Sequence, residues 1–179
     1  MDHFSELVTK SISCGDYHSI AITVDDFVFS WGDNTYGQLS TGDYQSSDLP
    51  KLVQNIEFNI SKVISLKSST YFLTKEGKIY YCGEHYINGI EGNTPKPIEL
   101  ITNCDKHFID ISSGSPNYYC LAKTNESIYE IMKNELKLFD TKHKNIDQYF
   151  VDKFHITYQT IDLTQNRFQE ENNLIGNSF

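Results

Sequence analysis

Short stretches in which apolar and polar residues alternate recur along the chain. The first two occupy residues 20–24 and 27–31 and are joined by Asp25-Asp26. Alternation over five residues is typical of a half-buried strand, and a two-residue link between two such stretches predicts a tight antiparallel hairpin. A further strand is expected before it, at residues 8–13.

A glycine-rich segment follows this hairpin and predicts turns rather than a strand. Gly32, Gly37 and Gly42 can adopt positive φ angles, and Gln38-Leu39 places a polar residue beside an apolar one. Pro50 follows, and because proline lacks a backbone N–H, the next strand is expected at the edge of a sheet.

The same pattern recurs at intervals of about 40 to 50 residues, which is typical of a propeller or solenoid. The second copy contains a turn at 75–78 and a glycine-containing turn region around Gly89 and Gly92, which the third copy lacks. Residues 132–139 fit either a strand pair or a short helix, and we expect strands because Leu136 and Leu138 alternate with polar residues. The sequence therefore predicts an all-β fold, a single domain over 1–179 with three to four blades of about four antiparallel strands. The expected blades cover approximately 8–53, 63–100, 108–140 and, more faintly, 149–179.

The first copy resembles the repeat of the regulator of chromosome condensation (RCC1-like) family. That repeat has a glycine and a histidine before a hairpin, followed by Trp-Gly-x-Asn-x-x-Gly-Gln-Leu-Gly. The matching residues are Gly15, His18, Trp31, Gly32, Asn34, Gly37, Gln38, Leu39 and Gly42. Ser40 departs from the pattern, which has glycine at that position. The resemblance implies an incomplete RCC1-like β-propeller, because rings of this type close with more blades than this chain supplies.

We interpret the motif residues as structural rather than catalytic. Trp31 is expected to pack between blades, and His18 to form a hydrogen bond to a neighbouring blade. A glycine-rich loop can hold a phosphate, but no Lys-Ser/Thr pair follows Gly37 or Gly42, so no cofactor is expected. The sequence contains no Gly-x-Ser-x-Gly and no His-Glu-x-x-His, and we therefore predict that the chain is not an enzyme.

Charge and cysteine content restrict the class of partner. A net charge of -9 disfavours direct binding of nucleic acid. The acidic side chains in the expected turns could bind a basic protein partner or could simply be solvated and keep the protein soluble. Cys14, Cys82, Cys104 and Cys120 lack paired spacing and are expected to be free, buried thiols. A metal site on Cys82-x-x-His85 would need a second pair of ligands, so no metal is expected.

The sequence shows neither a membrane span nor the basic and apolar start of a signal peptide. An intracellular protein, cytoplasmic or nuclear, is expected, without a membrane partner.

An incomplete ring would expose apolar blade faces, so the chain is expected to associate. The main hypothesis is a non-catalytic protein-interaction scaffold within a larger assembly, covered by a protein partner, by a propeller-completing chain or by a second copy. The resemblance also implies an alternative, a guanine-nucleotide exchange factor for a Ran-type small GTPase. In that family one propeller face and an inserted hairpin act on the GTPase, and the sequence does not locate this hairpin. A degenerate repeat fragment without function is the third hypothesis.

Overall fold

The computed structural model describes residues 8–54, 56–87, 90–100, 106–113, 120–132 and 135–140. The chain divides into two compact units, Met1–Ile146 and Asp147–Phe179, and every described residue belongs to the first. The fourth expected blade, 149–179, lies outside the described residues, and the single-domain assignment stays a prediction.

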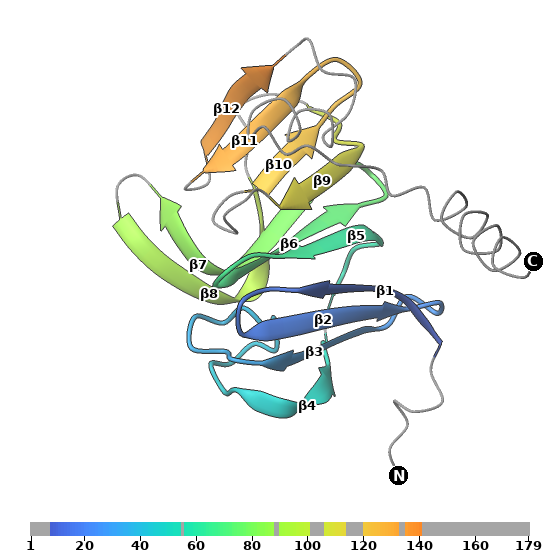
Figure 1. Ribbon diagram of the computed structural model, residues 1–179, viewed down its shortest axis with the longest axis vertical. Coiled ribbons are helices and arrows are strands. Elements are labelled where there is room, and N and C mark those ends of the chain that lie inside the picture. The colour runs from blue at the N-terminus through green and yellow to red at the C-terminus, as the bar shows by residue number, and fades with distance from the viewer. Residues whose placement is uncertain are drawn as a thin grey trace, which may run out of the picture. The chain divides into compact units, whose positions relative to one another are not determined.

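The described strands form three antiparallel sheets of four strands each, which we call blades 1, 2 and 3 (Figure 1). Blade 1 contains β1 (Thr9–Cys14), β2 (His18–Thr23), β3 (Val28–Gly32) and β4 (Ser47–Leu52). Blade 2 contains β5 (Ile60–Ser65), β6 (Ser69–Thr74), β7 (Ile79–Ile87) and β8 (Ile90–Glu99). Blade 3 contains β9 (Asp110–Ser113), β10 (Cys120–Lys123), β11 (Ile128–Met132) and β12 (Glu135–Asp140). The described residues include no helix, hence none able to cross a membrane, and the all-β prediction is confirmed.

The predicted hairpin of blade 1 is present, but its third strand has a different buried face. β2 and β3 pair from His18↔Gly32 to Ile22↔Val28. Val28 and Ser30 are buried, whereas Phe27 is half exposed in the turn that precedes β3. The apolar alternation at residues 27, 29 and 31 therefore does not lie in the core between blades 1 and 2.

Prolines mark edge strands in this fold. Pro50 lies in β4 at the edge of blade 1, as the sequence predicted. In blade 2 the glycine-containing turn expected around Gly92 is wrong, because Gly92 lies within β8 and pairs with His85. Gly89 lies outside the described residues. β8 contains Pro95 and Pro97, and it tolerates them because it too is an edge strand.

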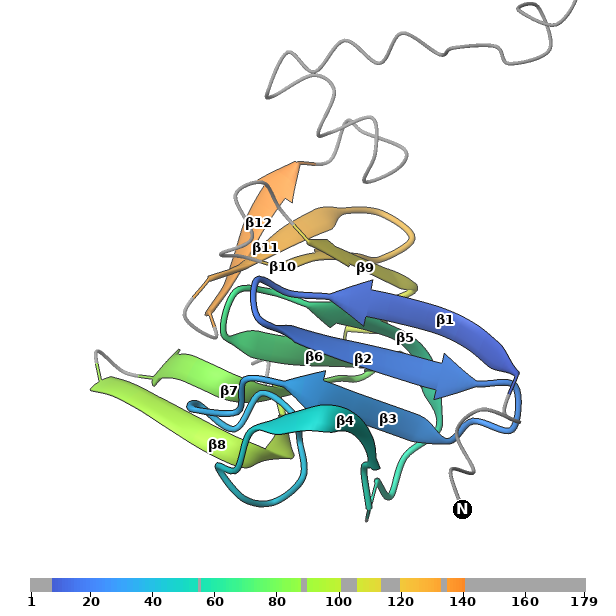
Figure 2. The same cartoon turned by 60° about the horizontal axis from the view of Figure 1, so that its bottom comes forward.

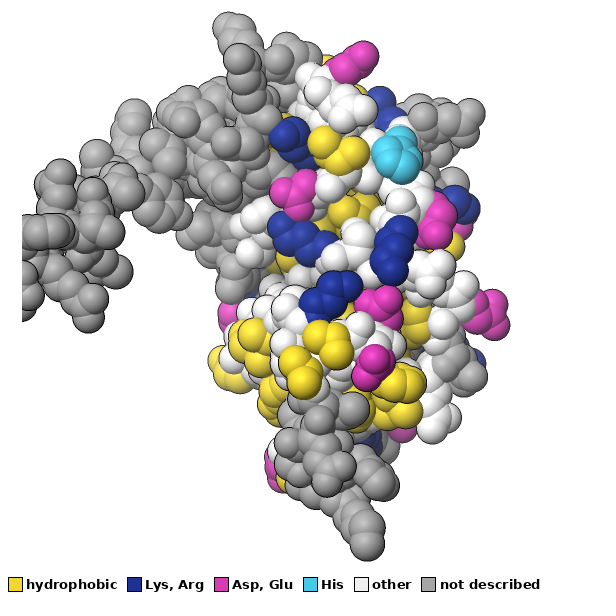
Figure 3. Space-filling model, turned by 90° about the vertical axis from the view of Figure 1, so that its right-hand side faces the viewer, with side chains coloured by type: hydrophobic (Ala, Val, Ile, Leu, Met, Phe, Trp, Pro, Cys, Tyr) yellow, Lys and Arg dark blue, Asp and Glu magenta, His cyan; other side chains and the backbone are white. Residues whose placement is uncertain are grey.

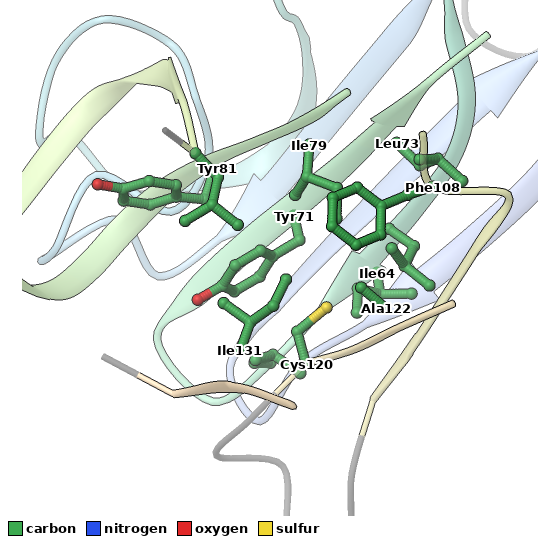
Figure 4. Close-up of a cluster of buried hydrophobic side chains, with 12 residues drawn as sticks. Ile64, Tyr71, Leu73, Ile79, Tyr81, Phe108, Cys120, Ala122 and Ile131 are labelled. Carbon is green, nitrogen blue, oxygen red and sulfur yellow. The ribbon is translucent and has the colours of Figure 1, made fainter. Parts of the chain in front are cut away.

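Two hydrophobic clusters join the blades. Between blades 1 and 2, Ile20, Ile22 and Val28 pack with Val63, Phe72 and Cys82. Between blades 2 and 3, the cluster in Figure 4 includes Tyr71, Phe108, Cys120 and Ile131. Full burial of a side chain such as Phe72 contributes about 2 to 3 kcal/mol. Each blade therefore depends on its neighbour for its core.

The first strands of successive blades lie next to one another (Figures 1 and 2). Ser65 donates its backbone N–H to Ser13 Oγ at 2.7 Å, and its hydroxyl donates to Ser13 O at 3.3 Å. These bonds join β1 to β5 and hold blade 2 in a fixed position relative to blade 1.

Exposed ion pairs also link the blades. Asp26 lies 3.1 Å from Lys10 Nζ and 3.2 Å from Lys75 Nζ, and Lys62 Nζ lies 2.7 Å from Asp110. Figure 3 shows basic and acidic side chains interspersed on one face of the molecule, with hydrophobic side chains gathered below them over blade 1. Exposed pairs contribute little stability.

Candidate interaction site on the first blade

The segment between β3 and β4, residues 33–46, forms a closed loop that we call the motif loop. The buried Asn34 holds it together. Asn34 Nδ2 lies 2.9 Å from Asp43 O, 3.2 Å from Gln45 O and 3.2 Å from Thr41 Oγ1, and Asn34 Oδ1 accepts the Leu39 N–H at 2.9 Å. One amide thus satisfies backbone groups on both sides of the loop, which explains why an asparagine is needed there.

Asp33 provides the second fixed point of the motif loop. Its Oδ2 accepts from Gln38 Nε2 at 2.6 Å, and its Oδ1 accepts from Thr35 Oγ1 at 2.6 Å. Partial burial alone would raise the pKa of Asp33, but hydrogen bonds from Thr35, Gln38 and Ser46 outweigh it and lower this pKa. Asp33 is therefore ionised at neutral pH and orients Gln38.

The motif loop contacts blade 2 through its backbone. Gln38 O accepts a hydrogen bond from Thr70 Oγ1 at 2.8 Å, and Gly42 N donates to Pro95 O at 2.9 Å. His18 contributes a third link, because its Nε2 lies 2.9 Å from Thr70 Oγ1. The hydrogen bond predicted between His18 and a neighbouring blade is present.

Three positions in the motif loop, Gly37, Ser40 and Gly42, have a left-handed backbone. Gly37 has a φ of 85°, and a Cβ there would lie 2.5 Å from Pro95 Cα, so both conformation and space require glycine. Ser40 has a φ of 61° at the position where the family pattern has glycine. Its hydroxyl is buried without a nitrogen or oxygen partner, although the Cys82 thiol lies near it.

The remaining motif residues fill tight spaces. A Cβ at Gly15 would lie 2.1 Å from Leu66 O of blade 2, and Gly32 has a φ of 105°. Leu39 is fully buried, and its carbonyl accepts the Ser30 hydroxyl at 2.7 Å. These contacts are consistent with structural roles for the motif residues.

Trp31 lies on the opposite side of blade 1 from the other motif contacts. Because paired residues of neighbouring strands share a face, Trp31, which pairs with Ser19, lies on the face away from Ile20. Trp31 is half-buried and belongs to neither described inter-blade cluster, so its packing between two blades stays a prediction.

This outer face of blade 1, which we call the open face, is apolar. Ile12 pairs with Ala21, Ala21 pairs with Phe29, and Phe29 pairs with Leu52. The side chain of Ile12 is 60% exposed and that of Leu52 is 43% exposed. Exposed apolar side chains of this kind mark an interaction site.

The other two blades have the same register, and there the equivalent residues are covered by a neighbouring blade. In blade 2 the paired residues are Val63, Phe72 and Tyr80, which pack against blade 1. In blade 3 the paired residues, which pack against blade 2, are Ile111, Ala122 and Tyr129. The open face is therefore the position where a preceding blade would pack.

The described cysteines are free thiols, some buried and one exposed. Cys82 and Cys120 are buried thiols, as predicted, and burial raises the pKa of Cys82 to about 12. Cys14 is exposed, so its predicted burial is wrong; it pairs with Ser19 and lies on the face of blade 1 away from Ile20. Cys104 lies outside the described residues. The described residues contain no group of three His, Cys, Asp or Glu side chains suited to a metal.

Sequence reasoning missed three features of this region. Asp33 and Thr70 have no place in the motif, and only the contacts of the motif loop show what they do. The third feature is the length of the β7–β8 hairpin, which continues beyond Gly83 through the pairs Glu84↔Asn93 to Ile87↔Ile90. Tyr86 and Ile87, an aromatic and a β-branched residue of high strand propensity, are a signal that could have shown it.

Comparison with known proteins agrees with this geometry. Residues 9–38 and 25–73 match two models of the regulator of chromosome condensation (RCC1) repeat. The E3 ubiquitin-protein ligase HERC2 of Homo sapiens is 30% identical over 127 residues, which cover 68% of this chain but 3% of that protein.

Two solved structures have a similar fold. Human WBSCR16 gives a TM-score of 0.64 at 21% identity, over 78% of this chain and 41% of that chain. Prp20p from Saccharomyces cerevisiae, whose structure was described together with its binding properties to Gsp1p and histones, gives a TM-score of 0.56 at 22% identity, over 68% of this chain and 32% of that chain.

This chain thus spans a small part of HERC2 and well under half of each of these structures. Its three described sheets are blades of an RCC1-like β-propeller, a protein-interaction fold. The chain belongs to the RCC1-like repeat family.

Proposed function

We propose that this chain is a non-catalytic protein-interaction scaffold that works within a larger assembly. The observation that carries the proposal is the open face of blade 1, where Ile12 is 60% exposed although the equivalent Val63 and Ile111 are 6% and 0% exposed. An apolar sheet face left in water is unfavourable, and covering it by a protein partner removes that penalty.

The environment of the polar residues in and beside the motif supports a non-catalytic role. The His18 ring forms a hydrogen bond with Thr70, and the Asp33 carboxylate accepts three side-chain hydroxyl or amide hydrogens. Gln38 Oε1 accepts the backbone N–H of Tyr36 in the same loop. Groups engaged in this way hold a loop in place. We accordingly propose that no bond chemistry takes place at the motif.

Composition supports a protein as the partner. The net charge of -9 disfavours a nucleic-acid backbone. We propose an intracellular site of action, cytoplasmic or nuclear.

Affinity capture with a matched pair of variants tests this proposal. We expect Ile12→Asp, on the open face, to lose a partner that the wild-type chain retains. Val24→Asp, at the exposed turn after β2, should retain it, because Val24 is 54% exposed and lies outside the open face. If the two variants and the wild type capture the same proteins, the open face is not the interaction site, and a degenerate fragment becomes the better description.

A second candidate function is guanine-nucleotide exchange on a Ran-type small GTPase. The observation that favours it is the extension of the β7–β8 hairpin beyond Gly83, since the family is known to act through a hairpin. The test is nucleotide release from a Ran-type GTPase, with the intact chain and with a variant lacking residues 85–92. The hypothesis of nucleotide exchange is wrong if the intact chain does not accelerate release of the nucleotide.

A further inference from the structure

We propose that a cavity between the motif loop and blade 2 binds a short peptide segment of a protein partner, in which an arginine lies close to an acidic side chain. We call this hollow the inter-blade cavity. The inference goes beyond the proposed scaffold function, because the inter-blade cavity shares no lining residue with the open face and specifies the chemistry of its ligand.

The inter-blade cavity has a volume of about 410 Å³, which is within the range of ligand-binding pockets. Its walls come from the motif loop, from the connection between blades 1 and 2, and from strands β7 and β8. They include residues 40–42, Glu57, Phe58, Tyr80 and Lys96. The hydrogen bond of 2.9 Å from Gly42 N to Pro95 O holds the motif loop against β8. The cavity is therefore bounded by segments that are fixed to one another.

Two stacked aromatic rings contribute to the wall. The rings of Phe58 and Tyr80 have centroids 4.1 Å apart and an interplanar angle of 14°. The buried Phe72 meets the Phe58 ring edge-on, with 6.1 Å between centroids, and the Tyr80 hydroxyl donates to Glu99 Oε2 at 3.0 Å. Both rings are thus held in place before a ligand binds. A fixed aromatic surface favours a planar cation such as the guanidinium group of arginine.

Two opposite charges line the same cavity and do not neutralise each other. Glu57 and Lys96 are both exposed, and neither forms an ion pair with any residue that the structure describes. The nearby Glu99, by contrast, pairs with Lys78 at 3.0 Å. The Lys96 side chain lies along the motif loop, since a Cβ added at Gly42 would be 3.4 Å from Lys96 Cε. Glu57 is therefore available to a guanidinium group and Lys96 to a carboxylate.

This combination favours a peptide over other small ligands. A phosphate group would meet one lysine among the lining residues and would be repelled by Glu57. An entirely apolar ligand would displace water from Glu57, Lys96 and the Gln54 amide without replacing its hydrogen bonds. A peptide supplies both charges on neighbouring side chains, and its backbone supplies partners for Gln54.

Titration of the full chain with blocked peptides tests the inference. The probes are N-acetylated, C-amidated alanine peptides that contain one arginine and one glutamate, separated by zero, one or two alanines. NMR follows the ring resonances of Phe58 and Tyr80, and we expect at least one probe to shift them with a Kd on the order of 1 mM or lower. Replacing its arginine by citrulline, which keeps the shape but removes the charge, should weaken binding about fivefold. The inference is wrong if no probe shifts these resonances.

Matched protein variants test the two charges. Glu57→Gln and Lys96→Met should each weaken binding of the best probe about fivefold. Glu126→Gln in blade 3 and Lys51→Met on β4 change the net charge in the same way at exposed positions outside the cavity, and they should leave the affinity unchanged. Equal losses in all four variants would show that only long-range attraction holds the peptide, which would overturn the site.

Inorganic phosphate is the competing probe. At the same concentration it should leave the Phe58 and Tyr80 resonances unshifted. A shift that Lys96→Met abolishes would mean that the cavity is an anion site, and the assignment of a peptide would be wrong.

The outcome separates this inference from the proposed function. We expect Ile12→Asp to bind the probe with unchanged affinity. If no probe binds but Ile12→Asp still loses a cellular partner, the inter-blade cavity is not a site and the scaffold proposal stands. If a probe binds but no partner depends on Ile12, the cavity stands and the proposed role of the open face fails.

Discussion

His18 and Thr70 are joined across the boundary between blades 1 and 2, with 2.9 Å between His18 Nε2 and Thr70 Oγ1. Thr70 has one hydroxyl hydrogen, which it donates to Gln38 O. His18 must therefore donate from Nε2, so its neutral form carries the proton on that nitrogen. The buried Nδ1 has no partner in the described part of the chain, and a Cβ at Gly15 would lie 2.7 Å from it.

This arrangement predicts a loss of stability in mild acid. Burial lowers the pKa of His18 from its ordinary value to about 4, although Asp33 and Asp16 act in the opposite direction. Because the unfolded state takes up the proton first, the free energy of unfolding falls as the pH drops from about 6.5 to about 4. The expected loss is about 3 kcal/mol, measured by urea unfolding at pH 7, 5.5 and 4.5. His18→Gln, which cannot titrate, should be less sensitive over this range; equal sensitivity would assign the effect to other groups.

Replacing Thr70 by valine should destabilise the contact between blades. Thr70→Val retains the shape of the side chain but leaves the His18 N–H and Gln38 O without their partner. We expect a loss of about 2 kcal/mol in the free energy of unfolding. Thr9→Val, at an exposed position on β1, is the matched control and should change stability little. A Thr70→Val protein as stable as the control would show that water replaces both bonds.

Ser40 is a position where a substitution should stabilise the protein. Its φ of 61° is unfavourable for any residue with a Cβ, and its buried hydroxyl has no oxygen or nitrogen partner. Ser40→Gly relieves the backbone strain, so we expect a gain of about 1 kcal/mol in thermal or chemical unfolding. Ser40→Ala removes only the hydroxyl and separates the two causes. No gain from glycine would mean that the backbone strain at this site is negligible.

Asn34 should tolerate no replacement that removes its donor group. Asn34→Asp retains an acceptor for the Leu39 N–H but cannot donate to Asp43 O or Gln45 O. It also places a buried charge near Asp43. We expect a loss of about 3 kcal/mol in the free energy of unfolding and faster proteolysis within the motif loop. Tyr36→Phe, at an exposed side chain of the same loop, is the control. Similar losses for both would indicate a loop that is sensitive throughout.

The blade pattern was readable from the sequence where the signal is local. The hairpin after His18, the edge position of Pro50 and the assignment of strands within 132–139 depend on alternation and on the missing N–H of proline. Each of these was predicted, and each is present.

The errors occur where the outcome depends on a neighbouring blade. Gly92 suggested a turn, but pairing with β7 extends the strand through it. Cys14 was expected in a core, but it is exposed and pairs with Ser19 on the face of blade 1 away from Ile20. The link from Thr70 to Gln38 joins residues 32 apart in sequence, so no local pattern reveals it.

The motif loop has a practical implication for dissecting the chain. It follows β3 in sequence, yet Gln38 O and Gly42 N bond to Thr70 and Pro95 of blade 2. Truncation at the connection between blades 1 and 2 would break both hydrogen bonds. It would leave polar backbone atoms without partners. Minimal expressible pieces are therefore expected to span at least two consecutive blades, ending beyond residue 99.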